Sequence, residues 1–107
     1  MKQYVFINRV PANYDRTDAQ KVNSAWTMLT QSWKEKDIFV SSFVFPAEGY
    51  LVSGDDTTVS NGYQLTDGRK IVSVITVKAE NYEDAVGMAA ACPHIAQSGS
   101  VEVRAVM

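Results

Sequence analysis

Apolar and polar residues follow one another along the chain in blocks that predict strands and helices. Short apolar runs rich in β-favouring residues predict the strands, and apolar residues at helical spacing predict the helices. We expect strand, helix, strand, hairpin, strand, helix and strand at residues 4–10, 17–36, 38–45, 57–66, 71–79, 81–92 and 100–106. This order is a βαββαβ frame with an inserted β-hairpin, and therefore predicts an α+β fold.

Each expected helix has an N-terminal cap and an apolar stripe. Thr17 and Gln20 have the spacing of a capping box, so the first helix is expected to begin at Thr17. Asn81 is a favourable N-cap for the second helix. The stripes consist of Val22, Trp26, Leu29 and Trp33 in the first helix and of Ala85, Met88, Ala89 and Cys92 in the second.

Turn residues mark the hairpin region. Asn61-Gly62 lies between two β-compatible quartets and predicts a two-residue type I′ hairpin. Asp67-Gly68 predicts a second tight turn just before the longest strand. Residues 46–56 are loop-like, with a short strand expected at 50–52.

The expected central strands are apolar on both faces. The last strand alternates, so that Glu102 and Arg104 point away from the helices. The segments 4–7 and 71–79 do not alternate in this way, and they occupy the centre of a βαββαβ sheet. Because two helices cover only one face, we expect a second copy to cover the other, in a homodimer closed through the sheet face.

Composition restricts the class of protein. The chain has 107 residues, which suits a single domain over 1–107. Its net charge of −2 and its scattered basic residues argue against nucleic-acid binding. No apolar run approaches bilayer length, and Asn8 and Arg9 come too early for a signal peptide. We therefore expect no membrane association and a cytoplasmic location.

The only cysteine, Cys92, and the only histidine, His94, flank Pro93. A catalytic thiol needs a lowered pKa, whereas Cys92 is predicted at a helix C-terminus, where the dipole disfavours the thiolate. We interpret Cys92 as a core residue and His94 as a capping group at the helix end. His94 is kept as a secondary catalytic candidate. One cysteine and one histidine make a poor zinc site, so no metal is expected.

Other candidate site residues lie in turns and strands. Asp67 is a second catalytic candidate, as a general base, with a purely structural turn as the alternative. The candidates for ligand contacts are Arg9, Tyr50, Tyr63, Glu102 and Arg104. The charged members of this group suit an anionic ligand, and the alternative is a set of ion pairs at an interface or a solvated edge. The sequence has no phosphate loop or dinucleotide fingerprint, so no cofactor is predicted.

Three stretches resemble the YCII-related proteins, most of all their DGPF branch. They are TDG at 66–68, NYEDAVGMAAACP at 81–93 and GSVEVRAVM at 99–107. The resemblance covers the whole chain as architecture but only residues 66–107 as sequence. It implies a ferredoxin-like α+β fold, with an antiparallel sheet and both helices on one face, that pairs into a dimeric α+β barrel.

The resemblance implies little about catalytic activity. A reactive His–Asp pair has been proposed in the YCII branch, with the histidine on the first helix and the aspartate in an Asp-Pro step after the second. Here residues 17–36 contain no histidine, and the corresponding step is Cys92-Pro93, so neither residue is carried over. The branch motif also differs, because Arg69-Lys70 follows the Asp-Gly step where Pro-Phe would stand.

Three functions remain open. The first is a small homodimer that binds an anionic or aromatic metabolite in a cleft between helices and sheet, with any catalysis being cofactor-free acid/base chemistry such as isomerisation or elimination. The second is a non-enzymatic ligand-binding or protein-interaction module. The third is a cofactor-independent monooxygenase of the dimeric-barrel type, for which Trp26, Trp33 and Asn8 are available. Several ionisable groups with perturbed pKa values in one pocket would favour an enzyme.

Overall fold

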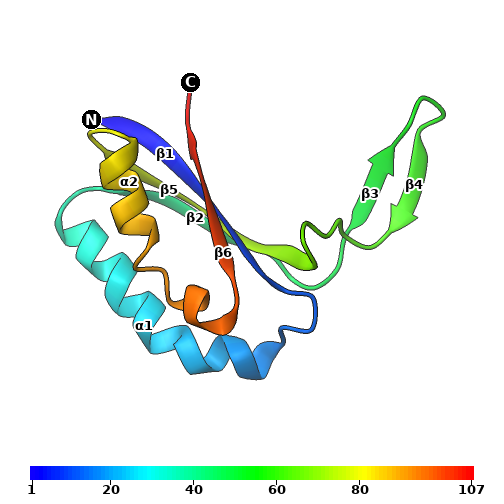
Figure 1. The fold of residues 1–107 in the computed structure, drawn as a ribbon, viewed down its shortest axis with the longest axis horizontal. Coiled ribbons are helices and arrows are strands. Elements are labelled where there is room, and N and C mark those ends of the chain that lie inside the picture. Colours follow the sequence, from blue (N-terminus) through cyan, green and yellow to red (C-terminus); the bar gives the residue numbers. More distant parts are fainter.

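An antiparallel sheet with two helices on one face forms the body of the protein (Figure 1). The computed structural model describes residues 1–107, apart from the side chain of Asn61. The elements are β1 (Lys2–Pro11), α1 (Arg16–Glu35), β2 (Phe39–Val44), β3 (Tyr50–Ser53), β4 (Thr58–Asn61), β5 (Arg69–Ala79), α2 (Tyr82–Ala89), the 3-10 helix η1 (Pro93–Gln97) and β6 (Ser100–Ala105). The main sheet has the order β2-β5-β1-β6, while β3 and β4 form a separate two-stranded sheet.

This arrangement is consistent with the predicted βαββαβ frame and its inserted hairpin. β1 and β5 are the central strands, and every neighbouring pair in the main sheet is antiparallel. The β3–β4 hairpin projects from the body beyond the end of β2 (Figure 1). None of the helices in the described structure is long and apolar enough to cross a membrane.

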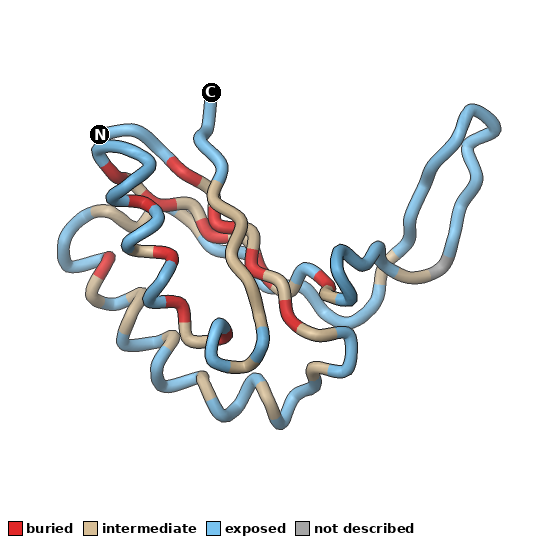
Figure 2. Tube along the Cα trace, viewed as in Figure 1, coloured by how far each residue is buried: buried red, intermediate tan, exposed pale blue. Residues whose placement is uncertain are grey.

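The core lies between the helices and one face of the sheet. Alternate residues of β1 are fully buried on this face, and those between them are only half-buried on the other, open face. Figure 2 shows the buried positions along the central strands and on the inner side of α2. Trp33 of the predicted α1 stripe packs edge-to-face on Phe6, with ring centroids 6.0 Å apart. Small residues of α2, Ala85 and Ala89, are buried in the same cluster.

The first helix begins two residues earlier than the capping box at Thr17 predicted. Asp15 is the N-cap: its carboxylate accepts from the Asp18 amide, and the Asp18 carboxylate accepts from the Asp15 amide. A carboxylate at the N-terminus of a helix accepts hydrogen bonds from the free amides and also interacts favourably with the helix dipole. This explains why the N-cap is Asp15 and not Thr17. The predicted cap of α2 is confirmed, because the Asn81 side chain accepts from the Asp84 amide at 2.8 Å.

The hairpin forms at a different turn from the predicted one. Asn61-Gly62 does not connect two strands; instead β4 ends at Asn61 and pairs backwards with β3. The connecting turn lies at residues 54–57, where Gly54 has φ of 82° and the Thr57 amide donates to the Gly54 carbonyl oxygen. The short strand expected at 50–52 forms as β3, within a segment that was otherwise predicted to be a loop. β4 pairs with this preceding strand instead of with a strand after Asn61-Gly62.

The second predicted turn, at Asp67-Gly68, is confirmed. Both residues have positive φ, 51° and 73°, as a type I′ turn requires. The flanking Thr66 and Arg69 exchange two backbone hydrogen bonds of 2.8 and 2.9 Å. This turn leads the chain directly into β5.

Candidate functional site

A cleft of about 240 Å³, called here the inner cleft, lies between α1 and the helix-covered face of the sheet. Its walls include Trp26 of α1, Ser73 and Ile75 of β5, and His94 of η1. The only lining side chain that can acquire a positive charge is His94, and none is a carboxylate. The inner cleft is therefore an uncharged environment at neutral pH.

His94 is buried in the wall of the inner cleft, with 1% of its surface exposed. Its ring stacks on Trp26, with centroids 5.5 Å apart and an interplanar angle of 14°. Nε2 lies 2.9 Å from the Ser100 carbonyl oxygen, so in the neutral ring Nε2 carries the proton and donates it. Nδ1 is then a hydrogen-bond acceptor, and within the described structure it has no partner.

The predicted role of His94 as a helix cap is wrong. The residue lies inside η1 rather than at the end of α2, and its side chain points into the core instead of to helix carbonyls. Burial lowers its pKa from the ordinary value of 6.5, and the hydrogen bond to Ser100 opposes this effect only partly. His94 is therefore neutral near pH 7, and its free Nδ1 can accept a proton or a hydrogen bond.

A second unpaired acceptor lies behind the inner cleft. Asn8 is fully buried on β1, and its Nδ2 donates to the Ser73 hydroxyl at 2.9 Å. The two residues are cross-strand partners in the β1–β5 register. The Asn8 Oδ1 atom has no partner in the described structure. Ser73 thus links a buried amide to the cleft surface.

Tyr14 is the other ionisable group that lines the inner cleft. Its hydroxyl donates to Gln97 Oε1 at 3.1 Å, and Gln97 Nε2 donates to the Asp18 carbonyl oxygen at 2.9 Å. Burial, followed by the nearby Asp18 carboxylate, raises the pKa of Tyr14 above its ordinary 10.0. Tyr14 is therefore a protonated donor at neutral pH, and its contacts join η1 to the start of α1.

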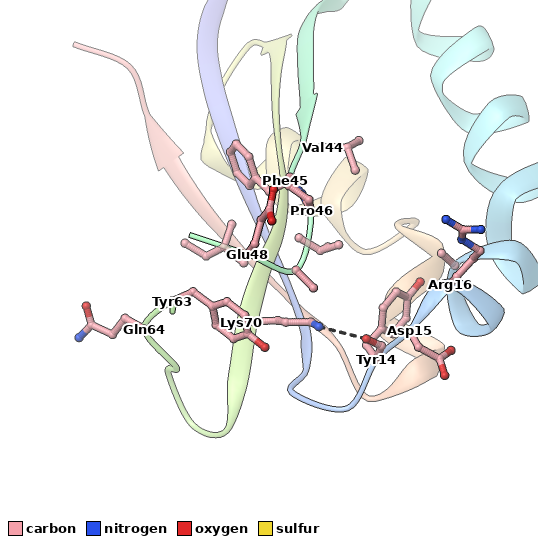
Figure 3. Close-up of a pocket in the computed structure, with 14 residues that line it drawn as sticks. Tyr14, Asp15, Arg16, Val44, Phe45, Pro46, Glu48, Tyr63, Gln64 and Lys70 are labelled. Carbon is pink, nitrogen blue, oxygen red and sulfur yellow. Dashed lines mark hydrogen bonds between the residues drawn. The ribbon is translucent and has the colours of Figure 1, made fainter. Parts of the chain in front are cut away.

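A larger and more open cavity of about 750 Å³, the outer cavity, adjoins the inner cleft. Both are lined by Tyr14 and by Val72, the extra residue of a bulge in β5 opposite Asn8 and Arg9. The outer cavity carries both signs of charge: its charged lining residues are Asp15, Arg16, Glu48 and Lys70. In Figure 3, Lys70 extends between Tyr63 and Tyr14. Its Nζ donates to the Tyr14 carbonyl oxygen at 3.0 Å and lies 5.5 Å from the Tyr63 ring centroid.

Cys92 is part of the core, as the sequence analysis predicted. It is buried in the main apolar cluster, and burial raises the pKa of its thiol to about 12. No side-chain hydrogen bond joins Cys92 to His94 in the described structure. The two residues therefore do not form a thiolate–imidazole pair.

The predicted charged candidates lie on the opposite face of the sheet from the inner cleft. In the strand register Glu102 is opposite Ile7 and Arg104 is opposite Val5, which places them on the open face. Glu102 accepts from Arg9 at 2.7 Å and from Arg104 at 3.3 Å. These bonds, that from Arg9 above all, lower the pKa of Glu102. The three residues form an ion-pair group, which was the structural alternative.

The remaining predicted site residues are dispersed. Tyr63 lines the outer cavity, Asp67 lies in the exposed type I′ turn, and Tyr50 lies on the exposed β3–β4 hairpin. The structure therefore brings only His94 and Tyr63 of the predicted candidates to the two adjoining cavities.

Sequence reasoning missed Tyr14 and Ser73 as site residues. A signal for Ser73 was present, because it interrupts an apolar strand at a buried position, as Asn8 does on β1. Burying polar side chains costs free energy, so a polar pair on the buried face of two central strands indicates a candidate functional position within the core. Tyr14 had no such signal, because it precedes α1 in a turn.

No protein-family model matches the chain, and no curated protein matches it significantly. The described residues contain no group of three or more His, Cys, Asp or Glu side chains placed to hold a metal ion.

Proposed function

We propose that this protein binds a small molecule in the inner cleft and moves a proton on it without a cofactor. One observation carries the proposal: His94 is buried against Trp26, its Nε2 is fixed by Ser100, and its remaining acceptor, Nδ1, has no protein partner in the described structure. A buried acceptor without a partner costs free energy. Nδ1 exposes less than 1 Å² of surface, so a ligand with an N–H, O–H or acidic C–H group would supply that partner once the side chains around the ring shift to open a path from the inner cleft.

The lining of the two cavities favours a particular shape of ligand. The inner cleft, at about 240 Å³, exceeds the roughly 150 Å³ of a cavity that holds benzene and therefore suits one substituted ring or a compact enol. Its apolar and uncharged walls favour the neutral part of the ligand. In the outer cavity, where Asp15 and Glu48 balance the charges of Arg16 and Lys70, the two cationic side chains suit an anionic substituent directed outward.

The ionisable groups of the inner cleft favour an enzyme over a simple binding module. Neutral His94 can take a proton at Nδ1, and the phenol of Tyr14 can return one to another atom of the ligand. The two pKa shifts keep His94 unprotonated and Tyr14 protonated at neutral pH, which are the forms that a base and an acid require, but both shifts move away from neutrality and so weaken each group in that role. The net reaction then requires no oxidant, reductant or metal.

We further propose that the protein is a homodimer of the ferredoxin-like α+β barrel type, as its resemblance to the YCII-related and DGPF proteins implies. Support comes from the open face of the sheet, where Val5, Ile7 and Val74 are only half-buried and Phe43 is 63% exposed. A second copy packed sheet against sheet would remove this apolar surface from water. The inner cleft lies on the other face, so binding and pairing would not compete. The single buried thiol of Cys92 is compatible with the proposed cytoplasmic location.

A thermal-shift screen with ring-sized phenols, enols and their carboxylated analogues tests the proposed binding. A ligand at about 100 times its dissociation constant stabilises the native state by about 2.7 kcal/mol. For a chain of this size that raises the melting temperature by about 10 °C or more.

Variants of His94 identify the atom responsible. His94→Gln places a donor near the position of Nε2 and keeps the bond to Ser100, but it removes the acceptor at Nδ1. We expect it to fold and to lose the ligand-induced shift. Asp67→Asn, in the exposed turn, is the control and should keep the shift. A full shift in His94→Gln, or no stabilisation of the wild-type protein by any compound of this class, would refute the proposal.

A further inference from the structure

In the described structure the β3–β4 hairpin does not pack extensively against any other strand or helix of its own chain. Every residue from 50 to 60 is exposed, and the hairpin stands clear of the sheet and helices in Figures 1 and 2. An isolated two-stranded hairpin is at best marginally stable in water. The hairpin is called here the arm (residues 50–61). Its own subunit does not stabilise it, so it needs a contact with another surface.

The arm has one apolar and one largely polar face. In the register of the pair, Val52 lies opposite Val59, and Tyr50 lies two residues before Val52 on the same side. The exposed fraction is 73% for Tyr50, 58% for Val52 and 61% for Val59. The other face carries Ser53, Thr58, Ser60 and a single large apolar residue, Leu51. An alternation of this kind is typical of a strand pair that packs one face against another surface.

The surface area of the chain exceeds the average for a folded monomer of its size. A folded monomer of 11.8 kDa is expected to expose about 5,900 Å², whereas this chain exposes 7082 Å². The excess of about 1,200 Å² is larger than the roughly 800 Å² that each partner buries in a standard interface. The chain therefore carries enough extra surface for a stable interface.

We propose that the apolar face of the arm packs against a second copy of this chain, each subunit clasping the other. This inference rests on the homodimer of the proposed function and adds the arm to its interface. Residues 45–49 connect the arm to β2, whose Phe43 lies on the uncovered open face, so the arm is tethered close to the surface that the proposed dimer covers. In a twofold dimer each copy supplies both an arm and a receiving surface, so the area buried by the arm counts twice. A net charge of −2 gives little repulsion between copies.

Sedimentation equilibrium of matched arm variants tests the proposal. The double variant Val52→Thr/Val59→Thr keeps the β-branched shape of both residues but makes the apolar face polar. We expect it to raise the dimer dissociation constant by at least about tenfold, because buried residues near an interface centre carry most of the binding free energy. Leu51→Thr, on the opposite face of the same strand, is the control and should change it by less than about threefold.

An independent variant separates this inference from the dimer itself. Ile7→Lys places a charge on the open face of the sheet and should dissociate the dimer through the sheet interface alone. If Ile7→Lys dissociates the protein while the arm variant associates like Leu51→Thr, the dimer stands and the arm proposal is wrong. A wild-type chain that is monomeric at every concentration refutes both.

Hydrogen exchange provides a readout that does not depend on any substitution. Backbone amides of residues 50–60 should become protected as the wild-type concentration rises through the dissociation constant. Unchanged exchange of these amides in a dimeric sample would overturn the proposal.

Discussion

Gly99 lies where the chain has no room for a side chain, and its replacement tests how the inner cleft is built. A Cβ atom at Gly99 would lie 2.5 Å from His94 Cδ2, 2.6 Å from the His94 carbonyl oxygen and 2.7 Å from the Arg9 carbonyl oxygen. Ordinary carbon contacts are about 3.5–4.0 Å, so each of these atoms would have to move by about 1 Å. Two of them are backbone atoms, and the His94 carbonyl also accepts from the Gly99 amide at 3.0 Å.

We therefore expect Gly99→Ala to destabilise the protein by about 2–3 kcal/mol, the upper range for overpacking a tight site. For a domain of this size that lowers the melting temperature by about 10–20 °C. His94 would be displaced from Trp26, so ligand stabilisation in the screen should also fall. Calorimetry of the variant, with and without a ligand identified by the screen, measures both effects.

Gly87→Ala is the matched control. Gly87 is exposed within α2, and a Cβ there would meet no atom within 4 Å. Because alanine is the better helix former, this variant should gain about 0.5–1 kcal/mol. If Gly99→Ala proved as stable as Gly87→Ala, the close contact between Gly99 and His94 would be wrong.

Further predictions concern titration, capping and reactivity. Burial depresses the pKa of His94 in the folded state, so the unfolded chain binds more protons below about pH 6.5; stability should fall as the pH drops through 6.5, and His94→Gln should flatten this decline in melting temperature. Asp15→Ala should cost about 1 kcal/mol in urea unfolding, whereas Thr17→Ala should cost clearly less, and equal losses would contradict the observed cap. Because burial raises the pKa of Cys92 to about 12, a disulfide reagent near pH 8 should modify it slowly in the native protein and rapidly in denaturant; rapid native labelling would contradict its place in the core.

The frame of the fold was predictable because its signals are local and repeated. Apolar spacing in α1 and α2 and dense apolar runs in β1 and β5 report directly which positions are buried. The hairpin was not predictable in the same way. Asn61-Gly62 is a good type I′ dipeptide, yet the strands of the hairpin are joined at residues 54–57, because β4 pairs with β3, which precedes it in the chain. The position of the hairpin turn therefore follows from which strands pair and not from the dipeptide alone.

The candidate site was predictable only in part. The polar residues Asn8 and Ser73 within apolar strands were visible, and their pairing follows from the β1–β5 register. His94 was not predictable as a cleft residue, because its burial depends on stacking with Trp26 and on the close approach of Gly99. Neither contact has a signature in the residues next to His94, whose position after Cys92-Pro93 suggests only a helix end.

Packing alone does not account for a histidine at position 94. The stacking on Trp26 and the burial would suit any planar apolar ring, and the bond to Ser100 uses only one of the two ring nitrogens. The other nitrogen and the Oδ1 of Asn8 are buried acceptors with no partner in the described structure. Each such group costs about 1–3 kcal/mol, a large share of the 5–15 kcal/mol that stabilises a typical domain. The unpaired acceptor of His94, whose ring lines the ring-sized inner cleft, is therefore a costly feature for which binding a hydrogen-bond donor gives a physical reason.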